Sequence, residues 1–417
     1  MPASSSGLPT STTFTADWVL PIAQPPIARG HVSCAGDHVV DVGTGHAGAV
    51  DLGRVALMPA MVNAHTHLEL SYLRGRVGPA RSFVEWVRVL LALRREAPDP
   101  HAAHIVEAAA RAYGEAVSSG TGVFGDVSNT LVTPLLGSPA PHVGGIVFHE
   151  LIGFRSDGAD AHIAAARDRA RGRRTDGVRV NPAPHAPYSV SPTLFRAIAE
   201  ELERDGSPIT TVHLAESPEE VQLLRDGSGP WRQVLEDLGA WDEAWQPPGM
   251  SPVAYMESLR FLGPSVLAVH AVQCDGADVA RLARCGATVV VCPRSNHHVG
   301  VGAAPIEAFY RAGLRVAIGT DSLASAPDLN VFEEMAHVRR AAPSVPARQI
   351  LESATRVGAE ALGCGDRHGA IAPGTAPGLI AVRLPSDVVD VEEYLVSGIG
   401  PERVSWVWHP RHDAAST

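Results

Sequence analysis

A series of short apolar runs along the chain is the feature that most constrains its fold. Each run is followed by a segment with helix-like spacing of apolar residues, and this alternation is typical of parallel α/β sheets. Eight such units are most simply arranged as a (β/α)8 TIM barrel, and fully apolar interiors fit strands that are buried on both faces. The runs lie at residues 58–63, 121–126, 143–149, 178–185, 209–213, 266–270, 288–292 and 315–321.

Both ends of the chain carry further strand-like runs, separated by Gly and Pro. They lie near residues 18–20, 38–42 and 55–57 before the series and at residues 378–384 after it. We expect the late run to pair with the early ones, because all are short, β-branched and bounded by turn residues. The sequence thus predicts a small β-sandwich domain from residues 12–57 and 366–410, and a barrel domain from residues 58–365.

Three other segments have recognisable patterns. Apolar residues at helical spacing predict helices over residues 83–95 and 104–117, and a helix over residues 347–362 that closes the barrel. Between residues 229 and 249 three tryptophans stand close together among Pro and Gly. This segment is either a lid near the mouth of the barrel or the ordinary packing of an irregular loop.

Polar and titratable residues stand at or just beyond the carboxyl end of nearly every run. Barrel enzymes place their working groups at these ends. A single histidine there is more often structural than functional, but four in register with the β/α period are difficult to obtain by chance. The residues are His65, His67, Asp126, His149, Glu150, His185, His213, His270, Asn296 and Asp321.

Four of these residues form a candidate metal site. His65 and His67 are two positions apart, so on a strand both imidazoles point to the same side. With His213 and Asp321 they supply the three or four N/O ligands that a catalytic zinc requires beside an open position for water. The chain contains no lysine, so a carbamylated lysine cannot bridge two ions, and we expect a single ion.

Glu216 follows His213 by three residues and is the candidate proton carrier. A carboxylate there can approach a water at the metal and move a proton from it to the substrate. Ser-Pro-Glu-Glu comes next in the sequence, so Glu216 also fits a carboxylate that is favoured by the dipole of a helix N-terminus. The two roles are compatible.

Composition excludes several classes of protein. The five cysteines are scattered without a Cys-x-x-Cys pair, which argues against a disulfide framework and for a reducing compartment. The formal charge of −11 disfavours nucleic-acid and anionic-membrane partners. No run is long enough to span a bilayer, and the N-terminus lacks the features of a signal peptide. We expect a cytoplasmic protein that binds a small molecule, and the sequence leaves a homodimer open.

The motifs taken together resemble those of the amidohydrolase superfamily. They are Val-Asn-Ala-His-Thr-His at 62–67, His-Leu-Ala-Glu at 213–216, His270, and Gly-Thr-Asp-Ser at 319–322. The similarity runs from about residue 17 to 385 and is greatest for the branch of cytosine, guanine and adenosine-type deaminases and chlorohydrolases. It implies one Zn²⁺ or Fe²⁺ ion held by His65, His67, His213 and Asp321, with Glu216 as proton shuttle, His270 as orienter of the attacking water and Asp321 as second base.

Two further segments resemble deaminases that act on adenosine-like thioethers. Ser-Phe-Val-Glu-Trp-Val at 82–87 implies that Glu85 binds the ribose hydroxyls, and His-Ala-Pro-Tyr at 185–188 implies that His185 contacts the nucleoside. The plainer alternatives are a solvent-facing helix glutamate and a buried structural histidine. Such polar groups line nucleoside pockets, which favours contact. The further candidate substrate contacts are Trp86, Glu150, Arg294 and Ser325.

Two departures from the pattern narrow the substrate. S-adenosylhomocysteine deaminases carry an arginine near the end of the third strand, where this chain has Glu150. Leu-Glu-Leu-Ser at 68–71 looks more like the aminodeoxyfutalosine deaminases of menaquinone biosynthesis, whose substrate bears a carboxylate. That carboxylate would need a cation, and the sequence does not choose among its candidates. These are Arg74, Arg81, Arg155 and Arg294.

We therefore expect a metal-dependent hydrolytic deaminase of a 6-aminopurine nucleoside derivative, with 6-aminodeoxyfutalosine as the best guess. Deamination of methylthioadenosine, adenosine or guanine is the alternative within the same class. Hydrolysis of a carbon–halogen or cyclic amide bond uses the same site, because pocket shape rather than the metal selects the bond. A non-enzymatic scaffold is disfavoured because every expected ligand is present.

Overall fold

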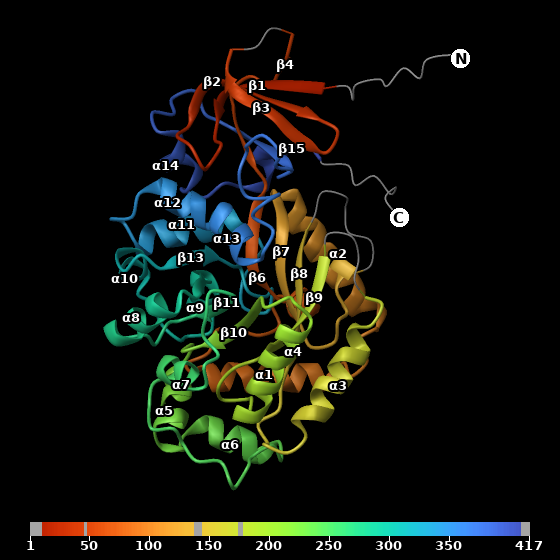
Figure 1. The fold of residues 1–417 in the computed structure, drawn as a ribbon, viewed down its shortest axis with the longest axis vertical. Helices are drawn as coiled ribbons and strands as arrows, with labels where there is room; N and C mark the ends of the chain where they lie inside the picture. Colours follow the sequence, from red (N-terminus) through yellow and green to blue (C-terminus); the bar gives the residue numbers. More distant parts are fainter. Residues whose placement is uncertain (1–10, 46–47, 137–143, 174–177, 410–417) are drawn as a thin grey trace, which may run out of the picture.

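The structure is a computed structural model that describes residues 11–45, 48–136, 144–173 and 178–409. A parallel α/β body and a sheet built from both chain ends follow one another along the long axis of the molecule (Figure 1). Of the described helices, none is both long and apolar enough to cross a membrane. The N-terminal residues 1–10, Val143 at the start of one predicted run and the predicted domain limit at residue 410 lie outside the described residues.

The eight predicted runs are strands, and they form two four-stranded parallel sheets in the order β6-β7-β8-β9 and β10-β11-β12-β13. Parallel strands bring all their carboxyl ends to one edge of each sheet. The strands are β6 (Met61–Thr66), β7 (Thr121–Ser128), β8 (Gly144–Leu151), β9 (Val178–Pro184), β10 (Thr210–Leu214), β11 (Val266–His270), β12 (Thr288–Val291) and β13 (Arg315–Ile318).

The two sheets meet at both of their edges. The His213 amide of β10 donates to the carbonyl of His185, just beyond β9, at 2.9 Å. On the other side, the Asp321 amide donates to the His65 carbonyl at 3.0 Å, and Thr66 forms a parallel bridge with Asp321. Residues far apart in sequence are therefore held side by side at the strand ends.

Helices alternate with these strands. The prediction for 83–95 and 104–117 is confirmed by α1 (Phe83–Glu96) and α2 (Ala103–Ser118). The others are α3 (Ala159–Ala170), α4 (Pro192–Arg204), α5 (Pro218–Asp226), α6 (Pro230–Asp237), α7 (Pro252–Ser258), α8 (Gly276–Cys285), α9 (Pro293–His298), α10 (Ile306–Arg311), α11 (Val331–Ala341), α12 (Ala347–Ser353), α13 (Arg356–Ala361) and α14 (Val391–Leu395), with 3-10 turns η1 (Leu68–Leu73), η2 (Pro134–Leu136) and η3 (Pro401–Arg403).

The helical stretch predicted over 347–362 consists of two helices, α12 and α13, with a break between them. Thr355 between them has φ −138° and ψ −93°, which is not helical. The carbonyl of Ala354 accepts a hydrogen bond from the Val62 amide of β6 at 2.8 Å. The break thus gives a backbone acceptor to the strand that carries the first two candidate ligands.

The terminal sheet has seven strands in the order β15-β14-β5-β1-β2-β3, with β4 paired to β1. The late run pairs antiparallel with β5, as predicted. All seven strands belong to one hydrogen-bonded sheet rather than to two separately paired sheets. They are β1 (Ser11–Val19), β2 (Ile27–Ala35), β3 (His38–Thr44), β4 (Val50–Asp51), β5 (Val55–Pro59), β14 (Leu379–Arg383) and β15 (Val404–Trp408).

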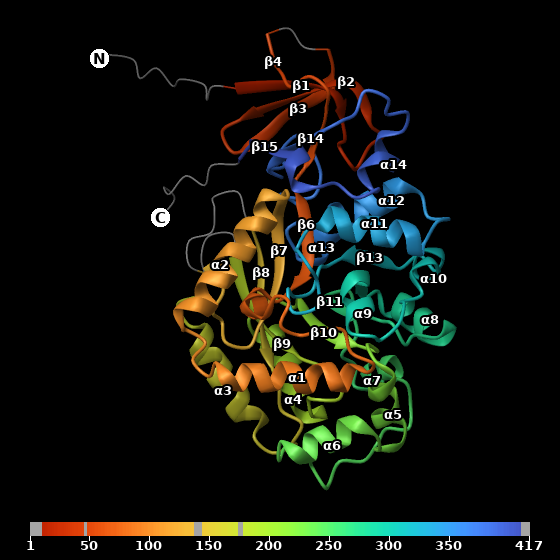
Figure 2. The same cartoon turned by 180° about the vertical axis from the view of Figure 1, so that it is seen from behind.

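The carboxyl ends of the parallel strands point away from the terminal sheet. Strand β6 starts two residues after β5 ends, so it leaves that sheet and runs into the α/β body. At the far side of the body, α1 and α6 lie beyond the strand ends (Figure 2). The candidate site therefore lies at the end of the α/β body that is remote from the terminal sheet.

The tryptophan-rich segment 229–249 begins with α6 and is packed rather than open. Trp231 stacks on Tyr188 with ring centroids 4.0 Å apart, and Trp241 and Trp245 lie 5.5 and 5.2 Å from Phe154. Of the two interpretations left open by the sequence, the contacts favour ordinary packing. This packing closes one side of the strand ends.

Candidate metal and catalytic site

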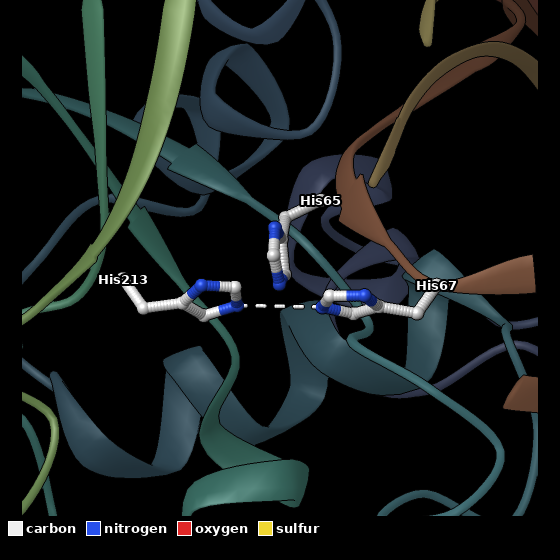
Figure 3. A group of neighbouring side chains, drawn as sticks. All are labelled: His65, His67 and His213. Atoms are coloured by element: carbon white, nitrogen blue, oxygen red, sulfur yellow. Dashed lines mark hydrogen bonds between the residues drawn. The ribbon is translucent and has the colours of Figure 1, made fainter. Parts of the chain in front are cut away.

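His65, His67 and His213 converge at the carboxyl ends of β6 and β10. One ring nitrogen from each lies within 4.8 Å of the others, and the imidazoles face a common point (Figure 3). The Nε2 atoms of His67 and His213 are 3.3 Å apart. Two ligands of a tetrahedral zinc at about 2.0–2.1 Å would be about 3.3 Å from one another, so the spacing fits one ion.

The chemistry of these donors also fits a divalent cation. Within the described residues, both ring nitrogens of His65 are buried without a hydrogen-bond partner, which is costly unless a ligand fills the gap. Burial, with the neighbouring imidazoles of His67 and His213, holds the pKa of His65 well below its usual range. Neutral imidazole is the form that binds metal.

The tautomer of His213 is fixed by the backbone. Its Nδ1–H donates to the carbonyl of His185 at 3.0 Å. This leaves the Nε2 lone pair free to face the point that the three imidazoles share. A ligating histidine is ordinarily held in this way through its second nitrogen. The strand pairing that joins the two sheets therefore also orients the ligand.

Asp321 lies beside the three histidines. Its Oδ1 is 3.7 Å from His67 Nε2 and 3.9 Å from His65 Nε2, so it can complete an N₃O donor set. Its Oδ2 accepts hydrogen bonds from the hydroxyls of Ser295 and Ser325 at 2.5 and 3.2 Å. The serines fix the carboxylate, and Ser325, predicted to contact substrate, is placed as a partner of Asp321.

The glycine of the Gly-Thr-Asp-Ser motif has a packing reason. A Cβ at Gly319 would lie 2.7 Å from His65 Cβ and 2.8 Å from the His65 carbonyl oxygen. Such a distance is inside van der Waals contact, so any other residue would push the loop away from β6. Gly319 therefore allows Asp321 to approach the histidines.

Glu216 is the buried acid of the site, with 3% of its surface exposed. Burial, together with the nearby carboxylates of Asp321 and Glu220, raises the pKa of Glu216 well above its usual value. Its Oε1 lies 3.4 Å from His270 Nε2. A carboxyl group with a raised pKa can hold a proton near neutral pH and give it to a reacting atom.

His270 faces Glu216 with a defined orientation. Its Nδ1–H donates to Asn296 Oδ1 at 2.9 Å, so Nε2 is directed toward Glu216. Simple alternation along β11 would send His270 to the same side as Ala268. The positive φ of 73° at His270 interrupts that alternation, and its ring centroid lies 5.5 Å from that of His213.

Glu220 and Asn296 hold Glu216 and His270 in place, and Glu220 was not singled out from the sequence. The Glu220 carboxylate accepts from the Glu216 and Ala215 amides at 2.8 and 3.1 Å, while Ser217 caps α5. A serine followed three residues later by glutamate is the capping-box signal that could have found Glu220.

His185 lies within the same cluster. Its ring centroid is 5.0 Å from that of His213, and its Nδ1 is 2.6 Å from the Ser189 hydroxyl. Tyr188 packs edge-on against it at 5.5 Å, and Trp231 stacks on Tyr188. The aromatic packing of segment 229–249 thus reaches the site through His185.

Two residues at strand ends are not brought into the site. Asp126 accepts from the Leu68 amide at 2.9 Å and so holds the turn after His67. His149 lines a cavity with residues of α3 and α4. On β8 the neighbours alternate, so Glu150 faces the strand ends of the site while His149 faces the helices. The sequence could not show which of His149 and Glu150 faces the site, because β8 is buried on both faces.

Arg294, one of the candidate cations for a substrate carboxylate, is already paired within the protein. Its guanidinium donates to Glu334 at 2.6 Å, to the Asp328 carboxylate at 2.8 Å and to the Asp328 carbonyl at 3.0 Å. Arg294 is 8% exposed and Glu334 is fully buried. A buried ion pair of this kind holds the loop after β13 and leaves the guanidinium no donor set for a ligand carboxylate.

The remaining predicted contacts lie at the edge of the site. Trp86 is buried and stacks parallel to Phe83 at 6.1 Å. The Glu85 side chain is exposed on α1, and within the described part of the chain it makes no ion pair or side-chain hydrogen bond. Its assignment to the ribose stays a prediction.

Known proteins resemble this chain in sequence and fold. A model of the amidohydrolase family matches residues 56–399. An aminodeoxyfutalosine deaminase of Deinococcus radiodurans is 33% identical over 330 residues, which cover 76% of this chain and 76% of that protein. A 5-methylthioadenosine/S-adenosylhomocysteine deaminase of Syntrophobacter fumaroxidans is 29% identical over 372 residues, covering 80% of this chain and 73% of that protein.

A solved structure extends the similarity to the whole fold. The crystal structure of an adenosine deaminase from Xanthomonas campestris with bound Zn matches with a TM-score of 0.78 and 26% sequence identity. The match covers 96% of this chain and 91% of that one. The similarity therefore includes the terminal sheet as well as the parallel strands.

Proposed function

We propose, from the premise that this chain belongs to the amidohydrolase family, that it deaminates a 6-aminopurine nucleoside by hydrolysis. It is a hydrolase of carbon–nitrogen bonds other than peptide bonds, as its deaminase relatives are. The observation that carries the proposal is the pairing of a buried, proton-holding Glu216 with His270 beside three converging imidazoles.

One divalent ion, Zn²⁺ or Fe²⁺, would be held by His65, His67, His213 and Asp321. The three nitrogens within 4.8 Å and the adjacent carboxylate support this ligand set. Such an ion supplies Lewis-acid chemistry that lowers the pKa of a water toward neutrality. Zinc is supported by the bound Zn of the Xanthomonas campestris adenosine deaminase.

The chain's own residues would handle the protons. Glu216 would take the first proton of the attacking water and give it to the purine ring nitrogen next to the carbon that bears the amine, and its raised pKa favours holding that proton in between. His270 would orient the attacking water, since Asn296 fixes its ring. Asp321 would accept the second proton and pass it to the departing ammonia. The buried surroundings of Glu216 and His270 exclude bulk water from these transfers.

The substrate we favour is 6-aminodeoxyfutalosine, with 5-methylthioadenosine as the alternative from the same comparisons. A carboxylate-bearing substrate needs a cation, and three of the four candidate arginines are already engaged. Arg74 pairs with Glu115, Arg155 with Asp157, and Arg294 with Glu334. Arg81, just before α1, makes no ion pair within the described residues and is the remaining candidate.

The test is ammonia release by the metal-loaded protein from aminodeoxyfutalosine, methylthioadenosine, adenosine and guanine. We expect turnover of at least one adenine nucleoside, with the highest kcat/KM for aminodeoxyfutalosine. Arg81→Gln should raise KM for aminodeoxyfutalosine by about 10-fold or more, the cost of one charge-assisted contact, and leave methylthioadenosine unchanged. Failure to turn over any adenine nucleoside would contradict the proposal.

We further infer that the two parallel sheets close into a (β/α)8 barrel over residues 58–365, with residues 12–57 and 366–410 as a separate β domain. The hydrogen bonds that join β9 to β10 and β6 to β13 support closure. In a closed barrel all the carboxyl ends share one mouth, where loops build the active site.

A further inference from the structure

Glu150 is a buried carboxylate beside the metal site with one oxygen still unused. Its Oε1 lies 3.4 Å from Nδ1 of His213 and has no hydrogen-bond partner within the described residues. Glu150 and His213 are each 6% exposed. Because Oε1 itself is inaccessible to solvent, a substrate contact of the kind predicted from the sequence does not explain its position.

The other oxygen of Glu150 is held by Asn129, which follows β7. The Asn129 amide nitrogen donates to Glu150 Oε2 at 2.9 Å and to the Glu150 carbonyl at 3.2 Å. Arg94 of α1 donates to Asn129 Oδ1 at 3.2 Å. These bonds prevent the carboxylate from turning away from His213.

Glu69, from the Leu-Glu-Leu-Ser segment, organises the loop that carries Asn129. It accepts from the hydroxyls of Ser128 and Thr130 at 2.6 Å each and from the Asn129 amide at 3.2 Å. The Leu-Glu-Leu-Ser segment, which pointed to a substrate class in the sequence, therefore has an internal structural role through Glu69. A chain of contacts leads from Glu69 through Asn129 and Glu150 to His213.

We propose that Glu150 is a positioning residue for the metal site, which strengthens the binding of a divalent ion through His213 and is itself held by Asn129 and Glu69. An ion on Nε2 draws electron density from the ring and makes Nδ1–H more positive. A carboxylate 3.4 Å away then stabilises the ion-bound state more than the ion-free state. The proposal rests on the proposed ligand set but not on the identity of the substrate.

The test is a titration of the ion-free protein with Zn²⁺ in competition with a chromophoric chelator, without substrate. Glu150→Gln keeps the shape of the side chain and removes its charge, and we expect Zn²⁺ affinity to fall about 10- to 100-fold, the usual effect of removing such a partner. The melting temperature of the ion-free variant should not fall, because an incompletely paired buried charge is removed.

The matched control is Glu201→Gln. Glu201 is also a buried glutamate, on α4, but its partners are Arg167 and Arg204. Because Glu201 shares no partner with the metal site, the Zn²⁺ affinity of Glu201→Gln should stay within about twofold of wild type. Unchanged affinity in Glu150→Gln, or an equal loss in Glu201→Gln, would overturn the proposal.

A second variant keeps the proposal testable if Glu150→Gln does not fold. Asn129→Ala leaves Glu150 intact but removes the amide that holds it, so we expect a smaller loss of Zn²⁺ affinity in the same direction. Wild-type affinity in Asn129→Ala would then contradict the role of Glu150. A protein that binds Zn²⁺ in this pattern but deaminates no nucleoside would refute the proposed function alone.

Discussion

The two parallel sheets contribute to one site by different means. At the strand ends of the second sheet, the non-glycine residues Ala215, His270, Ala271 and Asp321 all have positive φ values, between 49° and 73°. Among the described residues of the first sheet, Leu131, three residues beyond β7, is the nearest equivalent. The second sheet aims its side chains by bending the backbone, at a cost in strain that the surrounding packing must offset.

The first sheet places its side chains with fewer such bends of the backbone. His65 lies near the end of β6 and His67 directly after it, and Glu150 is held by Asn129 and Glu69. The first sheet thus supplies two of the three converging imidazoles and the support of Glu150, whereas the second supplies the third imidazole with Glu216 and Asp321. On the proposed mechanism, metal binding would depend on both sheets and proton transfer mainly on the second.

Removing one imidazole from either sheet is the change with the largest expected effect. His67→Ala and His213→Ala should each lower metal affinity by more than about 100-fold, beyond the usual effect of a supporting residue, and abolish turnover. Metal content after dialysis, measured by mass spectrometry, and ammonia release check this. If one variant keeps a full equivalent of metal, the sheets do not share the ion.

Glu216→Gln should separate metal binding from turnover. The amide cannot carry a proton, so kcat should fall by about 100- to 10,000-fold, the range for a general acid–base group. Metal content should stay at the wild-type level, because Glu216 is not in the ligand group. Ammonia release and metal analysis on the same preparation test this, and near-normal turnover would show that another residue carries the proton.

Much of this arrangement could be predicted from the sequence, because it depends on the β/α period and on which residues stand at the ends of the apolar runs. The β/α alternation gave the strand ends, and the residues at those ends include all four candidate ligands. The His-x-His spacing placed His65 and His67 on the same side of a strand, as the structure confirms. Strand alternation is local, so it needs no knowledge of distant contacts.

Other features depend on contacts that local pattern does not encode. The role of Asn129 exists only because Glu150 lies across the sheet from it. Arg294 looked free in the sequence, but Glu334 reaches it from α11, 40 residues later. At the break between α12 and α13, the Ala354 carbonyl accepts a hydrogen bond from the Val62 amide of β6. Buried polar partners far apart in sequence decide each of these cases.

His149 and Glu150 are sequence neighbours on β8, and His149 gives the smallest expected effect. Burial lowers the pKa of His149 to about 4, from 6.5. As pH falls, the unfolded chain takes up a proton below about 6.5 while the folded protein does so only near 4, so wild type loses stability across this window. Removing the imidazole should make the loss between pH 7 and pH 5 smaller by about 2 kcal/mol.

The measurement is urea unfolding of ion-free His149→Leu and wild type at pH 7 and pH 5. Other histidines titrate equally in both proteins, so the difference in pH dependence belongs to His149. Zn²⁺ affinity should be unchanged in His149→Leu, in contrast to Glu150→Gln, because His149 faces α3 and α4. An equal loss of stability in both proteins would show that His149 is not held neutral. Weakened Zn²⁺ binding would show instead that the two faces of β8 are not independent. Support of the metal site would then extend through His149 to the helices that cover β8.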